Sequence, residues 1–283
     1  MLKRKLGKTG EELTVVGFGG IVAAGEDPED VKRYVAKAVE EKGINYLDVA
    51  PSYGNAEELL GPAIEPYRDK LFLACKTGKR DAKGAEEELQ QSLKRLHTDH
   101  FDLYQFHGVT SVDEVKQIVG AGGALETFLK AREKGLTRYI GFSAHTEEAA
   151  IALIDQVEEL STVLFPLNWV CWNQRNFGPA VVKKAQEKNL GILALKALAK
   201  RKWKENEEHK WNKTWYSPVD TFEEASLALR FTLSQPITAA VSPSHNEFLW
   251  WMCDVAENLT PLSEKELEEV KKRSEGLEAI FPH

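Results

Sequence analysis

Four residues of types that hold or transfer protons follow short apolar segments of this chain: Asp48, Tyr53, Lys76 and His107. A tyrosine hydroxyl can donate a proton to an oxygen that gains negative charge, as when a carbonyl is reduced. The ordinary tyrosine pKa of about 10 is high for that task near neutral pH. A lysine ammonium about 4 Å away would favour the phenolate by about 4 kcal/mol at an effective dielectric of 20, or roughly three pKa units.

The other two residues complete a reaction centre for carbonyl reduction. We expect Asp48 to keep Lys76 charged and directed at Tyr53, so that together they lower the pKa of the phenol. His107 can hydrogen-bond the substrate oxygen and stabilise charge there. Taken singly, each residue is usually a cap, a surface charge or a satisfied core side chain. The prediction therefore rests on their order and context.

Repeated strand–helix units would have to position these side chains. We predict eight strands, several of them almost unbroken apolar runs as in strands covered on both faces: Leu13–Phe18, Ile44–Val49, Leu71–Cys75, Phe101–Phe106, Thr137–Phe142, Thr162–Pro166, Gly191–Leu195 and Thr238–Val241. Amphipathic segments between them predict helices at Pro28–Glu41, Glu86–Leu96, Ala124–Lys134, Glu147–Leu160, Pro179–Asn189 and Phe222–Ser234. Eight units favour an α/β (β/α)8 TIM barrel over a doubly wound sheet.

Four further segments surround this repeat. Lys5–Glu11 predicts an N-terminal β-hairpin that caps the bottom of the barrel. Ser263–Gly276 predicts an extra C-terminal helix with a capping box. The tryptophan-rich segment Arg201–Ser217 and the one between Gly108 and Gly123 lie where barrel loops line an active site. We interpret the tryptophans as anchors of a long loop rather than a substrate lid, and residues 1–283 as a single domain.

Composition excludes several classes of function. The net charge of −7 and pI of about 5.6 argue against nucleic-acid binding and against a polybasic membrane patch. Three separated cysteines and the lack of an apolar leader predict a cytoplasmic protein, with Cys75 a core thiol rather than a nucleophile. No metal site is expected, because a metal-dependent barrel hydrolase would need several histidines and carboxylates at strand ends.

The residues around the reaction centre resemble the aldo-keto reductase family, in its bacterial, short-loop form. Asn45–Gly54 is similar to the family motif Asp-x-Ala-x-x-Tyr-Gly, Leu73–Thr77 to its lysine strand, Asp102–His107 to its histidine strand and Glu88–Leu96 to the helix between them. The resemblance runs from about Leu6 to Asn258. It implies a (β/α)8 barrel, an NADP(H) or NAD(H) cofactor, and a catalytic tetrad at the four residues named first.

The resemblance also implies cofactor contacts, at Gly20, Ser143, His145, Asn168, Lys196, Leu198, Lys200, Ser242, Ser244 and His245. Ser143 and Asn168 correspond to residues that hold the nicotinamide carboxamide, while Lys196 and Lys200 are expected to neutralise the pyrophosphate. The chain departs from the family at Ala144, where the usual residue is asparagine, at Leu195, where an aromatic ring often stacks on the nicotinamide, and at Val241–Asn246, which lacks a cation for a 2′-phosphate. We expect NADP(H) to be only slightly favoured over NAD(H).

The implied activity is NAD(P)H-dependent reduction of an aldehyde or ketone to an alcohol, with a small carbonyl molecule as the partner. The alternative is a catalytically weak, nicotinamide-binding regulatory subunit, which the altered cofactor residues leave open. Phe281 near the C-terminus is a further candidate substrate contact. The sequence leaves the substrate open, and it fits a monomer or a small homo-oligomer.

Overall fold

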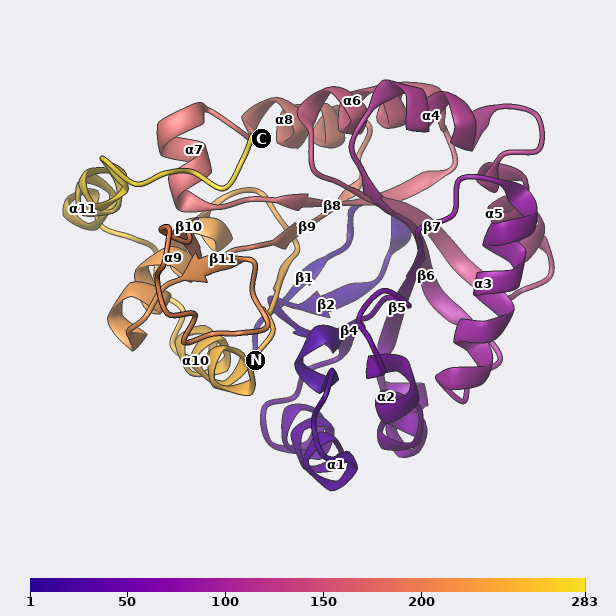
Figure 1. Ribbon diagram of the computed structural model, residues 1–283, viewed down its shortest axis with the longest axis horizontal. Coiled ribbons are helices and arrows are strands. Elements are labelled where there is room, and N and C mark those ends of the chain that lie inside the picture. The colour runs from indigo at the N-terminus through magenta and orange to yellow at the C-terminus, as the bar shows by residue number, and fades with distance from the viewer. Residues whose placement is uncertain (283) are drawn as a thin grey trace.

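Eight parallel strands close into a barrel in the computed structural model, which describes residues 1–282 (Figure 1). The strands follow one another around the barrel in chain order, and the last, β12, closes it by pairing with both β9 and β3. They are β3 (Val16–Gly19), β4 (Tyr46–Asp48), β5 (Phe72–Thr77), β6 (Phe101–Val109), β7 (Thr137–Ala144), β8 (Leu160–Pro166), β9 (Gly191–Leu195) and β12 (Ala239–Val241). Each predicted strand overlaps one of them, so the predicted (β/α)8 fold is confirmed.

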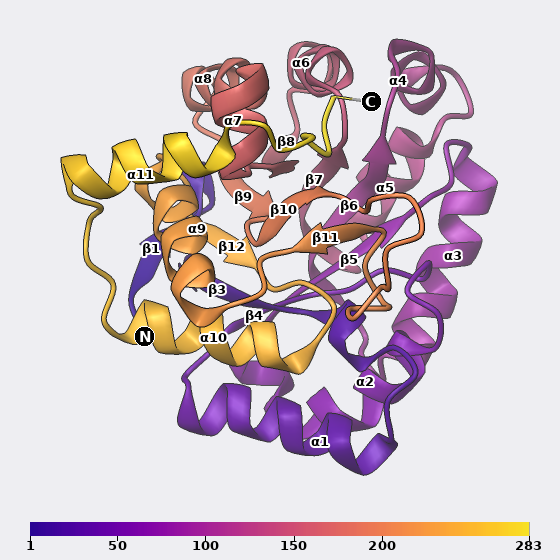
Figure 2. The same cartoon turned by 60° about the vertical axis from the view of Figure 1, so that its left-hand side comes forward.

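Helices form the outer layer around the barrel (Figures 1 and 2). They are α1 (Pro28–Ala36), α2 (Ala56–Ile64), α3 (Ala82–Arg95), α4 (Val112–Val119), α5 (Ala124–Glu133), α6 (Glu147–Gln156), α7 (Trp169–Arg175), α8 (Pro179–Glu187), α9 (Phe222–Ser234), α10 (Asn246–Glu257) and α11 (Glu264–Ser274). Many begin at a short polar side chain that accepts a backbone N–H of the first turn, as Asp27, Thr146 and Thr221 do. No helix within residues 1–282 combines the length and apolar character that a membrane span requires.

Several element boundaries differ from the sequence prediction. The expected strand Leu13–Phe18 is two strands, because Glu12–Thr14 (β2) pairs antiparallel with Lys3–Lys5 (β1) while only β3 enters the barrel. The helix expected over Glu147–Leu160 ends at Gln156, since Val157 takes an extended conformation. α1 continues from Lys37 to Glu41 as a π-helix. Three short helices, α2, α4 and α7, and the longer α10 lie outside the predicted helix ranges.

The N-terminal hairpin closes one end of the barrel, as predicted. A short 3-10 turn, Gly7–Thr9, joins β1 to β2, and the N–H of Lys8 donates to the carbonyl of Asn189 at 2.9 Å. Leu6 is fully buried and joins the apolar cluster that fills the barrel interior, together with Leu103 and Leu193. The carboxyl ends of the strands lie at the opposite end.

Two additions complete the molecule. The strand β10 (Ala199–Lys202) pairs antiparallel with β11 (Tyr216–Pro218), so the tryptophan-rich segment is a long excursion held at its base by a small sheet. The helix α11 has the predicted capping box between Ser263 and Glu266. After α11 the chain returns to the barrel, where Phe281 is buried with its ring 5.6 Å from that of Phe177.

Candidate active site

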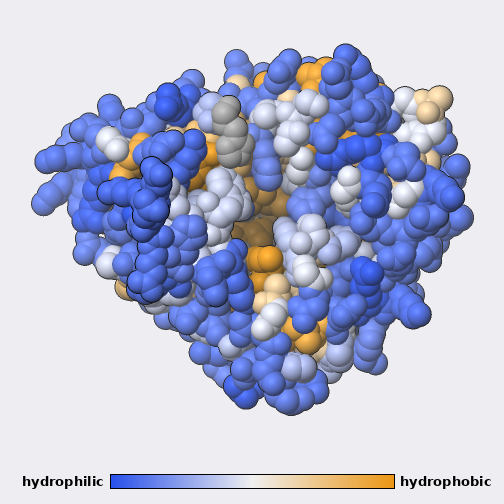
Figure 3. All heavy atoms as spheres, viewed as in Figure 1, coloured by the Kyte–Doolittle hydropathy of each residue, from blue (hydrophilic) through white to orange (hydrophobic). Residues whose placement is uncertain are grey.

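A pocket of about 270 Å³ opens at the carboxyl ends of the barrel strands, at the lower end of the usual size of small-ligand sites. Figure 3 shows it as a hollow in the middle of this face, with hydrophobic residues deep inside and a mostly hydrophilic surface around it. All four predicted catalytic residues line it: Asp48, Tyr53, Lys76 and His107. They come from β4 and the turn after it, from β5 and from β6, which are neighbours in the barrel.

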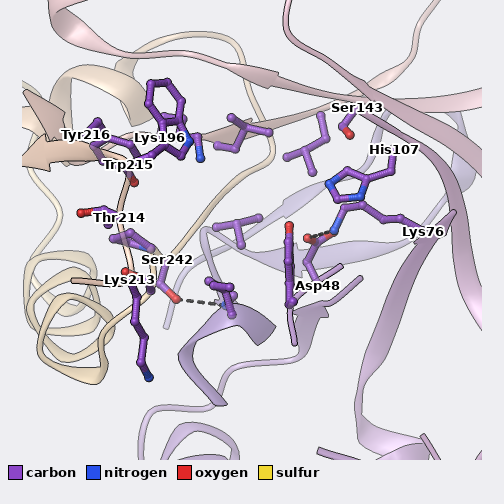
Figure 4. A pocket seen from close by; sticks show the side chains of 18 of the residues that line it. Asp48, Lys76, His107, Ser143, Lys196, Lys213, Thr214, Trp215, Tyr216 and Ser242 are labelled. Carbon is purple, nitrogen blue, oxygen red and sulfur yellow. Dashed lines mark hydrogen bonds and ion pairs between the residues drawn. The ribbon is translucent and has the colours of Figure 1, made fainter. Parts of the chain in front are cut away.

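Lys76 and Asp48 form a buried ion pair (Figure 4). The Lys76 ammonium donates to Asp48 Oδ1 and to the carbonyl of Val49, the latter at 3.1 Å. Burial lowers the pKa of Lys76, but the charges of Asp48 and Tyr53 raise it, and the net result lies above the ordinary lysine value. Lys76 therefore carries a positive charge at every physiological pH.

Tyr53 lies in the turn after β4, where its N–H donates to the carbonyl of Ala50 at 3.0 Å. The Lys76 ammonium is 5.3 Å from the centre of the tyrosine ring. Burial raises the pKa of Tyr53, Lys76 lowers it and Asp48 raises it, with a net result above the ordinary value. The prediction that Lys76 and Asp48 together lower this pKa is wrong, because burial outweighs the effect of the lysine and the negative charge of Asp48 opposes it. Tyr53 is a protonated phenol at neutral pH.

The His107 ring stands edge-on to Tyr53, with ring centres 5.8 Å apart. Burial and the nearby Lys76 charge lower the pKa of His107 to about 3. Its imidazole is therefore neutral near physiological pH, and its Nδ1 lies 3.4 Å from the Ser52 hydroxyl. A neutral imidazole beside a phenol can contact a substrate oxygen without taking the proton that the phenol donates.

Two further side chains contact the Asp48 carboxylate. The Tyr46 hydroxyl donates to Asp48 Oδ2 at 3.2 Å, and Gln105 Nε2 donates to the same oxygen at 3.0 Å. The sequence reasoning did not single out either residue. Both could have been found from the alternation of side chains along a strand, which repeats every two residues. This alternation places Tyr46 on the same face as Asp48 and Gln105 on the same face as His107.

Half of the ten predicted cofactor residues also line the pocket: Ser143, His145, Lys196, Ser242 and Ser244. The hydroxyls of Ser143 and Ser242 accept backbone N–H groups from Gly108 at 2.8 Å and from Gly19 at 3.0 Å. A side chain at Gly19 would overlap the carbonyl of Ser242, so only glycine lets the ends of β3 and β12 approach this closely.

Lys196 is the cation on the far side of the pocket from His107 (Figure 4). Its ammonium lies 5.4 Å from the Trp215 ring centre and 5.0 Å from that of Tyr216, and burial lowers its pKa to about 8. No hydrogen bond or ion pair of this ammonium is present within residues 1–282. Its backbone adopts a left-handed conformation with φ of 67°.

The other five predicted cofactor residues lie outside the pocket lining: Gly20, Asn168, Leu198, Lys200 and His245. Asn168 is fully buried as the N-cap of α7, where its oxygen accepts the N–H groups of Val170 and Cys171. Its amide nitrogen donates to the carbonyls of Lys196 and Ala199. Every polar atom of this side chain is thus used within the protein.

The side chains or backbones of the other four residues also contact the rest of the protein. Gly20 packs against Val49, where a side chain would overlap, and Leu198 is buried in the core. The Lys200 ammonium pairs with Glu224 at 2.6 Å. His245 begins α10, with its Nδ1 2.9 Å from the Ser244 hydroxyl. Of these four residues, Gly20 lies against the backbone of Asp48, but none of them lines the pocket with the catalytic four.

The two segments expected to line the pocket behave differently. Lys213, Thr214, Trp215 and Tyr216 do line it, whereas no residue between Gly108 and Gly123 does. The second expectation is wrong, because that segment folds into α4 on the outside of the barrel.

Of the tryptophans in residues 201–217, two anchor the excursion and one lies at the pocket. Trp203 stacks on His209 with ring centres 4.3 Å apart, and Trp211 packs on Phe248 at 4.5 Å, so both anchor the excursion as predicted. Trp215 instead stands at the pocket, 48% exposed. Its ring centre lies 5.7 Å from that of Phe281, so the C-terminal segment reaches the rim of the pocket.

No group of three or more histidine, cysteine or acidic side chains suited to a metal ion exists in the described part of the chain. Cys75 is fully buried, and burial raises the pKa of its thiol well above the ordinary value. This is the environment of a core thiol.

Comparisons with known proteins show the family of this chain. The model of the Aldo/keto reductase family matches residues 15–275. An uncharacterized oxidoreductase, YqkF, of Bacillus subtilis is 35% identical over 51% of this chain and 49% of its own length. The aldo-keto reductase YhdN of the same organism is 30% identical over 68% of this chain and 60% of its own. The aligned part thus spans about half to three fifths of these curated relatives.

Solved structures share the fold. The holo form of aldo-keto reductase AKR11C1 from Bacillus halodurans superimposes with a TM-score of 0.77 at 23% identity, covering 99% of this chain and 98% of that one. A thermostable aldo-keto reductase, Tm1743, gives a TM-score of 0.73 at 22% identity, over 96% of this chain and all of the other. With a family model that covers most of its length, the chain belongs to the aldo/keto reductase family.

Proposed function

We propose that this protein is an NAD(P)H-dependent oxidoreductase that reduces an aldehyde or ketone to an alcohol. The observation that carries the proposal is the placement of Tyr53 and His107 side by side at one pocket, above the Lys76–Asp48 ion pair. A protonated phenol, a neutral imidazole and a buried cation are the groups that a carbonyl oxygen needs when it becomes an alcohol.

Tyr53 is the proposed proton donor. Burial keeps its hydroxyl protonated at neutral pH, and Lys76 stabilises the phenolate that remains once the proton has left. Asp48 holds the lysine in place. His107, uncharged, hydrogen-bonds the substrate oxygen and fixes its orientation at the Tyr53 hydroxyl.

The pocket residues fit a nicotinamide cofactor. Leu164 and Leu195 from β8 and β9 supply apolar walls, Trp215 and Tyr216 supply aromatic ones, and Ser143 and His145 supply polar groups. Lys196 supplies a positive charge with no acidic partner within residues 1–282, which suits the pyrophosphate of either cofactor. When bound, the reduced cofactor supplies the hydride for the carbonyl carbon.

Our proposal on cofactor preference rests on the residues after β12, where the adenosine part of the cofactor would bind. Ser242, Pro243 and Ser244 line the pocket after β12, and no lysine or arginine follows them up to Glu257. The nearby cations are already paired: Lys213 with Glu26, Lys200 with Glu224 and Arg201 with Glu207. We propose that the protein accepts both cofactors, with NADP(H) only slightly favoured. A cytoplasmic location and a monomer or small homo-oligomer remain part of the same proposal.

The variant Tyr53→Phe tests the proposal. Oxidation of NADPH and NADH is followed with a panel of short aldehydes and ketones. We expect the variant to lose about 10²- to 10⁴-fold in kcat, the usual contribution of a general acid, with cofactor affinity unchanged. Turnover at the wild-type rate would overturn the role of Tyr53. Wild-type protein that binds cofactor without turnover would favour the regulatory-subunit alternative.

A further inference from the structure

The Asp48 carboxylate is held by more than its lysine. Lys76 donates to Oδ1, while the Tyr46 hydroxyl and the Gln105 amide both donate to Oδ2, at 3.2 Å and 3.0 Å. All four residues are buried, none more than 2% exposed. An ionised carboxylate only accepts hydrogen bonds, so Gln105 must present its nitrogen to it.

The barrel explains how these donors reach Asp48. Tyr46 precedes Asp48 by two residues on β4, and Gln105 precedes His107 by two residues on β6. Residues two apart on a strand share a face, so both side chains point into the barrel, next to the reaction centre. Lys76 on β5 is the register partner of Gln105 and lies between the two strands. Three adjacent strands thus enclose one carboxylate.

Stability alone does not account for Gln105. The barrel interior is usually filled by apolar side chains, and the neighbouring inward positions here are Leu103, Leu164 and Leu193. The amide oxygen of Gln105 has no hydrogen-bond partner within residues 1–282. A buried, unpaired amide oxygen destabilises a fold, whereas an apolar side chain of the same length would not. The contact with Asp48 is the one useful interaction that this amide makes.

We propose that Gln105 and Tyr46 are positioning residues of the reaction centre. They fix Asp48 Oδ2 so that Oδ1 faces Lys76, and through Asp48 they hold the lysine ammonium at the Tyr53 phenol. The inference rests on the proposed function for its kinetic consequences, but the contacts stand independently of it. Neither residue lines the pocket.

Loss of the two donors to Asp48 is expected to raise the pKa of Tyr53. Losing the two donors frees Lys76 to move away from the phenol and leaves the charge of Asp48 less well compensated. Both changes make Tyr53 a weaker acid, because Lys76 favours the phenolate and Asp48 disfavours it. The other groups that face Tyr53 are unchanged by the loss: Cys75, His107 and Tyr216.

The test compares Gln105→Met, Tyr46→Phe and the double variant with wild type. We expect each single change to lower kcat on the order of 3- to 10-fold with KM within about twofold, and to move the alkaline limb of the kcat–pH profile upward by about half a unit or more. Because both donors share one oxygen, the double variant should lose more than the product of the single losses.

Tyr104→Phe is the matched control. Tyr104 is the neighbour of Gln105 on β6, but its ring lies on the outer face, against Phe101 and Phe128. This variant loses a buried hydroxyl without touching Asp48, so its kcat and alkaline limb should match wild type. Thermal unfolding of all variants reports any general loss of stability.

Two outcomes overturn the proposal: an unchanged kcat, or a lower kcat with an unmoved alkaline limb, which would mean a structural role only. If wild-type protein reduces nothing, the proposed function fails but the positioning role can still be measured. The ultraviolet absorbance of each protein on alkaline titration, minus that of its Tyr53→Phe counterpart, isolates the Tyr53 phenolate. A titration that moves to higher pH in Gln105→Met supports the proposal, and an unmoved one overturns it.

Discussion

The two sides of the pocket are built in different ways. On the side of β4, β5 and β6, the side chains of Asp48 and Lys76 are locked by contacts with one another and with the barrel interior. On the side of β8, β9 and β12, the lining comes from the ends of these strands, from Ser242 and Ser244 and from the excursion between β10 and β11, and the Lys196 ammonium lies beside the rings of Trp215 and Tyr216. The first side suits chemistry with fixed geometry, and the second suits a ligand that brings its own charge. Variants on the first side should therefore change kcat, and variants on the second should change binding.

Lys76→Met is expected to have the largest effect. Loss of the ammonium leaves Tyr53 without its stabilising charge, and we expect kcat to fall on the order of 10²- to 10³-fold. It also leaves the buried Asp48 charge without its ion-pair partner, which should lower the free energy of unfolding by about 3–5 kcal/mol. Cofactor affinity, measured by quenching of tryptophan fluorescence, should stay within about twofold.

The double variant Asp48→Asn/Lys76→Met separates these effects. Removing both charges should recover most of the stability seen in thermal unfolding, without recovering kcat. A double variant with restored kcat would mean that Lys76 supports the fold rather than the reaction, and the contrast between the two sides would fail.

The two sides also differ in how well the sequence predicts them. Asp48, Tyr53, Lys76 and His107 were found because each lies at the end of a short apolar strand or in the turn after it, and the order of parallel strands brings consecutive strand ends together. Leu195 and Ser242 were placed for the same reason. The local pattern was sufficient wherever a strand end alone decides where a side chain points.

Asn168 and Lys200 show why other positions were missed. Asn168 follows β8 by two residues, but α7 begins there and its N–H groups capture the side chain as a cap. Lys200 lies after β9, yet β10 carries it to Glu224 on α9. In both cases a contact between elements distant in the chain decided the outcome, and neither short α7 nor the small β10–β11 sheet left a periodic pattern to detect. Gln105 was overlooked because its partner, Asp48, lies on another strand.

Lys196→Met should weaken cofactor binding with little effect on kcat. The pKa of Lys196 is lowered to about 8, so its charge is present at pH 7 and is lost as the pH rises through 8. Wild-type affinity for the anionic cofactor should therefore fall on the order of tenfold, about 1.4 kcal/mol, between pH 7 and pH 9. In the variant, affinity at pH 7 should equal the wild-type value at pH 9 and change little with pH. A pH dependence that survives in the variant would assign it to another group.

A smaller difference is expected between the affinities for NADPH and NADH. It tests the description of the pocket side formed by β8, β9 and β12. Because no lysine or arginine lies between β12 and Glu257, we expect the two dissociation constants from fluorescence titration to agree within about tenfold. Glu26→Gln frees Lys213 from its ion pair and is the informative variant, because Lys213 already lines the pocket. It should shift the ratio toward NADPH, whereas Glu224→Gln, which frees Lys200 outside the pocket, should not.

The smallest effect is expected for His107, whose charge should not change with pH near neutrality. Its pKa of about 3 means that the imidazole stays neutral from pH 5 to pH 8, where an ordinary histidine would titrate. The kcat–pH profile should therefore be flat across that range and fall only at alkaline pH, as Tyr53 loses its proton. A step near pH 6.5 that disappears in His107→Gln would show that this histidine is solvated and charged. The first side of the pocket would then lack the dry, fixed geometry that distinguishes it from the second.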